Sequence, residues 1–154
     1  MDKQEIDELI GGVQKVITWY SSSDFGDTDI HYLIKAKRKL VGYSYRFSEV
    51  VGYALDEYNV TYASRKTELA NKKLKYIEQG DTAGKAELKA ELKNYQLRLA
   101  EGENEALYRK VKSYFDTMRD AITSITQDIS ILRKEYEDSK VHDNGLLPIK
   151  KQLL

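Results

Sequence analysis

Basic and aromatic side chains are interleaved in three stretches of the sequence, within residues 35–53, 58–66 and 106–115. An aromatic ring can stack on a nucleic-acid base while a neighbouring cation neutralises its phosphate. This combination predicts contacts to single-stranded nucleic acid or to a small nucleotide. The predicted binding residues are Lys35, Arg46, Tyr53, Arg65, Lys66, Arg109 and Lys112.

Three amphipathic helices are expected to position these side chains, over about residues 3–20, 29–79 and 82–138. The segment SSSDFGD is expected to end the first helix, and Gly80 to end the second. Asp81 or Thr82 is expected to cap the third helix, which Gly102 can bend. The predicted buried residues are Ile6, Leu9, Ile10, Val13, Val16, Ile17, Tyr20, Leu33, Leu40, Phe47, Val51, Ala54, Tyr58, Tyr62, Leu69, Leu107, Val111, Tyr114, Met118, Ala121, Ile125 and Leu132.

The tyrosines of the second helix are predicted to divide between two faces. Tyr58 and Tyr62 lie on the buried stripe and Tyr43 borders it, whereas Tyr45 and Tyr53 fall about 140° away from it. Two glycines share that far side, at positions 42 and 52. Glycine on a helix surface permits close approach of another backbone. The far side is therefore either a contact between subunits or an exposed binding surface.

The two long helices are expected to form an antiparallel, coiled-coil-like hairpin with the first helix docked on one end. The predicted fold class is thus all-α. Because such a hairpin has little three-dimensional core, its remaining apolar faces predict a homo-oligomer. With the turn near residue 81, position i faces approximately position 162 − i, which brings Arg65 near position 97 and Arg109 near Tyr53. Lys85, Lys89 and Lys93 form a like-charged row, which is either a solvated face or a track for a polyanion.

We expect a single helical domain over residues 1–139 and a flexible or partner-docking tail over 140–154, where Asn144-Gly145 and Pro148 interrupt the helical pattern. The net charge is zero, but residues 30–79 carry ten basic and five acidic side chains. This segment is either a basic face for an anionic partner or one that attracts acidic segments within or between molecules.

Catalytic and metal-binding patterns do not occur in the sequence. There is no cysteine, and neither His31 nor His142 has metal-ligand spacing. We therefore expect no enzymatic activity, no cofactor and no metal. No apolar run approaches the roughly 20 residues of a membrane span, and the acidic start lacks signal-peptide features. The expected location is cytoplasmic, with no membrane partner.

Three stretches between about residues 55 and 135 carry a resemblance to a known family. They are YNVTYASRKTELANKKLKYIEQG, AELKAELKNYQLRLAEGENEALYRKVKSYF and MRDAITSITQDISIL. In these stretches the chain resembles the phage UvsY family of recombination mediators, small helical proteins that assemble into rings and help load a recombinase onto single-stranded DNA. The resemblance implies a recombinase or another protein as a partner, and the cytoplasm of a host cell as the location.

The leading hypothesis is a non-enzymatic, oligomeric, helical phage-type protein that binds single-stranded nucleic acid in recombination or replication. One alternative is a sponge that sequesters a nucleotide immune signal between helices, which near-zero net charge favours because a small anion needs few cations. Another is a coiled-coil scaffold with protein partners, which would require the tail at 145–154.

Overall fold

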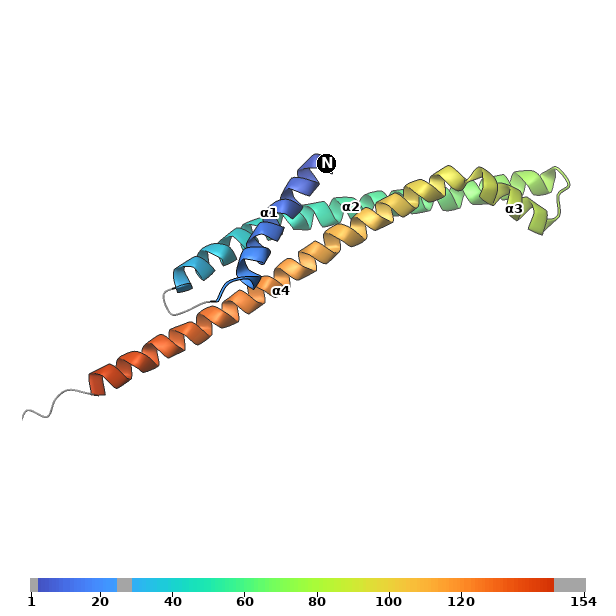
Figure 1. The fold of residues 1–154 in the computed structure, drawn as a ribbon. Coiled ribbons are helices and arrows are strands. Elements are labelled where there is room, and N and C mark those ends of the chain that lie inside the picture. The colour runs from blue at the N-terminus through green and yellow to red at the C-terminus, as the bar shows by residue number, and fades with distance from the viewer. Residues whose placement is uncertain (1–2, 25–28, 146–154) are drawn as a thin grey trace, which may run out of the picture. The chain divides into compact units, whose positions relative to one another are not determined.

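A computed structural model of the chain describes residues 3–24 and 29–145, with side chains described for 4–24 and 29–140. Over these residues it contains four α-helices and no strand (Figure 1). The helices are α1 (Lys3–Ser21), α2 (Ile30–Glu78), α3 (Ala83–Lys93) and α4 (Tyr95–Gly145). The all-α fold class is confirmed.

The chain divides into two compact units. The first unit comprises Met1–Ile10 and Tyr45–Asp116, and the second comprises Gly11–Ser44 and Thr117–Leu154. The expectation of a single domain over 1–139 stays a prediction. In the described part of the chain, no helix has both the length and the apolar character needed to cross a bilayer.

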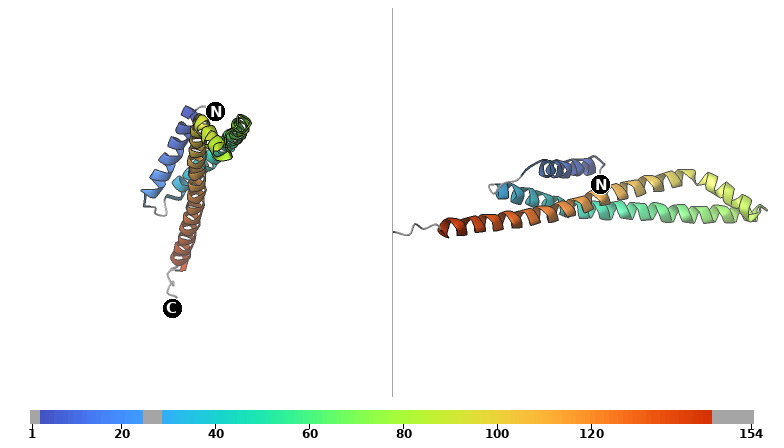
Figure 2. Two further views of the ribbon diagram at one scale, coloured as in Figure 1. Left: turned by 90° about the vertical axis from the view of Figure 1, so that its right-hand side faces the viewer. Right: turned by 60° about the horizontal axis from the view of Figure 1, so that its bottom comes forward.

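In the first unit, the second part of α2 runs beside α3 and the first part of α4 (Figures 1 and 2). The contacts follow antiparallel order: the Tyr58 and Tyr108 rings stack with centroids 6.4 Å apart, and Lys73 Nζ lies 3.0 Å from Glu87 Oε2. The buried apolar residues of this unit are Ile6, Leu9, Ile10, Phe47, Val50, Ala54, Ala86, Ala90 and Val111.

In the second unit, the remainder of α1 and the first part of α2 share a core with the second part of α4. Its buried residues are Val13, Leu33, Ala36, Leu40, Met118, Ala121, Ile125, Ile129 and Leu132. Tyr20 donates a hydrogen bond of 2.5 Å from its hydroxyl to Asp128 Oδ2, which joins the end of α1 to α4. Burial, together with this bond, raises the pKa of Tyr20 to about 12.

Helix α1 approaches α2 closely at Gly12. A Cβ atom built at this position would lie 2.5 Å from Tyr43 Oη and 2.7 Å from Tyr43 Cζ. Gly12 therefore leaves the space that the half-buried Tyr43 ring occupies, and any larger residue has to displace that ring.

Gly80 ends α2, as the sequence predicts. Its φ of +91° is readily adopted only by glycine. The Gly80 and Asp81 N–H groups donate to the carbonyls of Ile77 and Tyr76 at 2.9 and 3.0 Å, which is the Schellman pattern. Thr82 is the N-cap of α3, but its side chain makes no capping hydrogen bond.

Asp81, an alternative cap in the sequence analysis, holds two lysines instead. Its carboxylate lies 2.5 Å from Lys89 Nζ and 3.2 Å from Lys85 Nζ. These contacts lower the pKa of Asp81, with the hydrogen bond from Lys89 as the largest cause. Lys85 and Lys89 are therefore paired with a carboxylate, and this part of the predicted lysine row is not an unpaired track.

The predicted third helix is interrupted at Asn94, where α3 gives way to α4. Asn94 is 1% exposed. Its side-chain amide donates to the Arg65 carbonyl at 3.2 Å, and its Oδ1 accepts from Lys72 Nζ at 2.6 Å. Asparagine favours helix ends over helix interiors, and these tertiary contacts hold Asn94 at the break, whereas α4 runs through Gly102.

The C-terminal end of the helical pattern was placed too early. Helix α4 continues past position 138 and ends at Gly145, so residues 140–145 are helical and the predicted tail begins too soon. Residues 146–154, the remainder of the predicted tail, lie outside the described residues.

Most of the predicted stripe positions are buried, but several are buried only in part. Tyr62, predicted to be buried, is 36% exposed. The other predicted members that are only half-buried are Val16, Ile17, Tyr20, Val51, Tyr58, Leu69, Leu107 and Tyr114. A pair of helices covers one narrow face of each, so residues at the border of a stripe keep contact with solvent.

Candidate functional site

Four of the seven predicted binding residues are ion-paired within the first unit. The pairs are Arg46 with Glu5 (3.0 Å), Arg65 with Glu101, Arg109 with Glu105 (2.5 Å) and Lys112 with Asp116 (2.7 Å). A cation that already faces a carboxylate has to exchange that partner before it binds a phosphate. These four side chains are therefore poorer phosphate ligands than the sequence alone implies.

Arg65 is the most firmly held of the four. Its side chain is 19% exposed and that of Glu101 is 13% exposed. The hydrogen bond to Glu101 raises the pKa of the Arg65 guanidinium. Arg65 thus joins α2 to α4, and its charge is satisfied inside the protein.

The predicted aromatic positions of the first unit are accessible. Tyr53 is 37% exposed and Tyr45 is 72% exposed, off the buried stripe as the projection predicts. Lys66 Nζ lies 4.8 Å from the centre of the Tyr62 ring. The ion-pair partner of Arg109 is on its own helix, so the mixed patch of Arg109 and Tyr53 stays a prediction.

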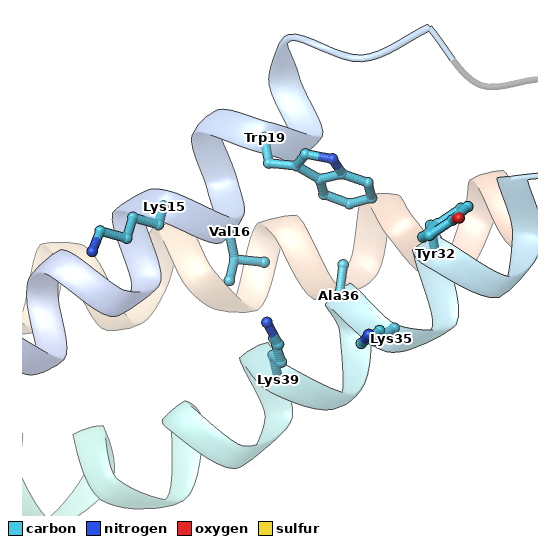
Figure 3. Close-up of a pocket in the computed structure, with 7 residues that line it drawn as sticks. All are labelled: Lys15, Val16, Trp19, Tyr32, Lys35, Ala36 and Lys39. Carbon is cyan, nitrogen blue, oxygen red and sulfur yellow. The ribbon is translucent and has the colours of Figure 1, made fainter.

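Lys35, the remaining predicted residue, lines a pocket of about 290 Å³ between α1 and α2 in the second unit. The Trp19 indole extends from α1 toward the part of α2 that carries Tyr32, and the Lys39 side chain is directed toward Val16 (Figure 3). The full lining is Lys15, Val16, Trp19, Tyr32, Lys35, Ala36 and Lys39. We refer to it as the α1–α2 pocket.

The three lysines of the α1–α2 pocket differ from the paired cations of the first unit. Lys15, Lys35 and Lys39 are exposed. None of them forms an ion pair with a carboxylate of the residues whose side chains are described. Two exposed aromatic rings beside three such lysines can stack an aromatic group and neutralise an attached anion.

Further basic side chains lie on the same part of α2, next to the α1–α2 pocket. Residues 30–44 carry four basic and no acidic side chains. Lys37 and Arg38 line a second groove of about 480 Å³, together with Arg133 of α4. At about 100° per residue, Arg38 lies on the exposed side of α2 between the two grooves. The positive surface therefore continues from the α1–α2 pocket across α2 to Arg133.

Trp19, Tyr32 and Lys15 were not among the predicted binding residues. A signal was present in IHYLIKAKRK, residues 30–39, where Tyr32, Lys35 and Lys39 share one helix face. The contribution of α1 could not be found in this way, because it depends on how α1 packs against α2.

The described side chains include no group of three or more His, Cys, Asp or Glu residues arranged to hold a metal ion. No protein-family model, curated protein or solved structure matches the chain. Functional inference therefore depends on the chemistry of the residues themselves.

Proposed function

We propose that the protein binds single-stranded nucleic acid, without catalysing a reaction, through the α1–α2 pocket and the adjoining cationic side of α2. The observation that carries this proposal is the group of lysines without carboxylate partners beside the exposed Trp19 and Tyr32 rings. Of the predicted residues, Lys35 belongs to this surface, and the paired cations of the first unit have a structural role.

Each part of the surface would supply one component of strand binding. A base would enter the α1–α2 pocket and stack on Trp19 or Tyr32, since every base has a π-face. Lys35 and Lys39 would contact the flanking phosphates. Arg38, Lys37 and Arg133 would then follow the backbone toward the second groove. This arrangement predicts weak sequence preference and strong dependence on salt.

The proposal includes a larger assembly and a biological role. The antiparallel contacts of the first unit support a long helical hairpin, and large apolar side chains on its surface support self-association. The resemblance to UvsY-type recombination mediators supports a role in phage recombination or replication, with a recombinase or another protein as partner in the cytoplasm of a host cell.

A small nucleotide is the second candidate ligand for the same pocket. The volume of about 290 Å³ favours it, because this is close to the lower limit of small-molecule sites and suits one base with its phosphate. This candidate corresponds to the sponge hypothesis. It predicts that a mononucleotide competes with the strand at similar concentration.

Fluorescence anisotropy of a labelled single-stranded oligonucleotide tests the proposal. Affinity should fall steeply between about 50 and about 200 mM salt. The double variant Lys35→Ala/Lys39→Ala should bind about tenfold more weakly at about 200 mM salt, and the slope of log affinity against log salt should decrease by about 1.4, since each single-strand phosphate contact contributes about 0.7.

The matched control is Arg109→Ala/Lys112→Ala, which removes the same charge from cations that are already paired. It should bind almost as tightly as the wild-type protein. Equal losses in the two double variants would place the contact elsewhere. Absence of binding at about 50 mM salt would remove the strand as ligand, and displacement by a mononucleotide would favour the second candidate.

A further inference from the structure

The polar side chains around the α1–α2 pocket are hydrogen-bond donors with one exception. Lys15, Lys35 and Lys39 each present an ammonium group, which donates three hydrogen bonds and accepts none. The indole N–H of Trp19 is a donor as well. Among the lining residues that the structure describes, the Tyr32 hydroxyl is the single side-chain group able to accept a hydrogen bond.

The backbone carbonyls next to the pocket are already engaged. Those inside α1 and α2 accept from an N–H group four residues further on. At the end of α1, the Thr18 carbonyl accepts from the Ser22 N–H and the Ser21 hydroxyl, each at 3.1 Å. The Trp19 carbonyl accepts from the Ser22 and Ser23 hydroxyls at 3.2 and 2.7 Å. A carbonyl oxygen has two lone pairs, so both of these carbonyls are fully used.

The four bases differ in whether their edges suit such a set of donors. Guanine presents O6 and N7, two neighbouring acceptors, and thymine presents the acceptor O4. Adenine and cytosine carry amino groups at the corresponding positions, N6 and N4, and these groups are donors. A lysine ammonium forms a charge-assisted hydrogen bond to an oxo group. Against an amino group it sets donor beside donor, and the amino group loses water without gaining an acceptor.

We propose that the α1–α2 pocket selects bases that carry an oxo group, namely guanine and thymine or uracil, over the amino bases adenine and cytosine. This inference rests on the proposed function, because it requires that a base enters the pocket. It adds which bases the pocket favours and the chemistry by which it distinguishes them.

Lys39 is the residue to which we assign the contact with the base edge. Its side chain is directed toward Val16 of α1, so its ammonium group lies on the side of α2 that faces α1 (Figure 3). An ammonium group has three donors. Lys39 can therefore hold a phosphate oxygen and donate to an oxo group of the stacked base at the same time.

The preference should be about five- to tenfold for an oxo base over the amino base of the same ring size, which is the lower end of what a good base-edge contact provides. The lower end applies because the pocket lysines are exposed, so water partly replaces the missing acceptor. The pocket holds one base, so a long strand of mixed sequence still shows weak overall preference.

Two matched pairs of ligands test the inference, because the members of each pair differ at the base edge and hardly in size. The first pair is labelled oligo-dT and oligo-dC of equal length, compared by anisotropy. The second is inosine monophosphate and adenosine monophosphate, as competitors of labelled oligo-dT; the inosine base has O6 and N7 like guanine. The oxo member of each pair should bind about five- to tenfold more tightly.

Lys39→Gln supplies an acceptor at the assigned contact, since a glutamine amide pairs with N6 and N7 of adenine. This variant should lose most of both preferences. The matched control is Lys37→Gln, which removes the same charge from α2. Because Lys37 lines the other groove, the control should bind more weakly and keep both preferences.

Three results would overturn the inference and leave strand binding intact. They are equal affinity within both pairs, tighter binding of the amino members, and preferences that persist in Lys39→Gln. Failure of every ligand to bind would overturn strand binding at this pocket, and the inference with it.

Discussion

Replacing Gly12 with alanine should loosen the packing of α1 on α2. The new Cβ would lie 2.5 Å from Tyr43 Oη and 2.7 Å from Tyr43 Cζ, about 1 Å inside ordinary contact distance. Both Tyr43 atoms are at the far end of its side chain, so the ring can move, but it leaves its half-buried position. Because Trp19 lies on the same helix, this change should also weaken strand binding at the α1–α2 pocket.

The magnitude follows from two opposing effects. Overpacking of this kind costs about 1–3 kcal/mol, while glycine to alanine inside a helix gains up to about 1 kcal/mol. Gly11 provides a matched control, because nothing described lies within 4 Å of a Cβ built there. Gly11→Ala should therefore stabilise the protein, and the two variants should differ by about 1–3 kcal/mol.

Urea unfolding followed by circular dichroism measures this difference. A second comparison uses a Tyr43→Ala background, in which Gly12→Ala should lose most of its cost because the ring it displaces is absent. Equal stabilities of the Gly11→Ala and Gly12→Ala variants would refute the reasoning. So would an undiminished cost of Gly12→Ala in the Tyr43→Ala background.

Three further predictions concern individual polar groups. The Asp81 pKa is lowered, so its contribution to stability is present above its ordinary pKa of 3.8 and lost as pH falls through the lowered value. Asp81→Asn should lower the melting temperature at about pH 7, and the difference from the wild-type protein should narrow as pH falls below 3.8. A difference that stays the same size at every pH would contradict this. The Tyr20 pKa is raised to about 12, so the stability from its neutral hydroxyl is present below the ordinary value of 10.0 and lost as pH rises through about 12. In an alkaline absorbance titration, one tyrosine should ionise near that pH, and Tyr20→Phe should remove that step; an unchanged titration would show that the hydroxyl is not held. Asn94→Ala should cost about 1–3 kcal/mol in urea unfolding, because buried hydrogen bonds are lost; a variant as stable as the wild-type chain would show that the break does not depend on this side chain.

The helices could be predicted from the sequence because local signals and burial agree. The first 147 residues contain no proline, and apolar residues recur at helical spacing over long stretches. Gly80 is a strong stop signal, since its backbone conformation is one that other residues rarely adopt. The predicted register was close as well: Arg65 was expected near position 97 and pairs with Glu101, one helical turn away.

The break at Asn94 could not be predicted in the same way. Its local sequence, AELKNYQL, contains neither glycine nor proline. The break depends on Lys72 and on the Arg65 carbonyl, both distant in sequence. A polar side chain whose hydrogen-bond partners are all distant in sequence leaves no trace in the spacing of apolar residues along the chain.

Whether a cation is available for binding cannot be predicted from residue type alone, because neighbouring carboxylates decide it. The pairs of Arg109 with Glu105 and Lys112 with Asp116 join residues four apart on one helix, so spacing alone could have indicated them. The pair of Arg65 with Glu101 and the pocket formed by Trp19 and Tyr32 depend on packing between helices. The predicted binding residues therefore stay a prediction, and the α1–α2 pocket is the site that we propose from the packing of the helices.

Intrinsic fluorescence is the most direct test of the central claim, because the sequence has a single tryptophan and that residue, Trp19, lines the α1–α2 pocket. Titration with an unlabelled single-stranded oligonucleotide should quench Trp19 in a saturable manner, with the same midpoint as the anisotropy titration. Lys35→Ala/Lys39→Ala should shift both midpoints together. A strand that binds by anisotropy and leaves Trp19 emission unchanged would contradict the account.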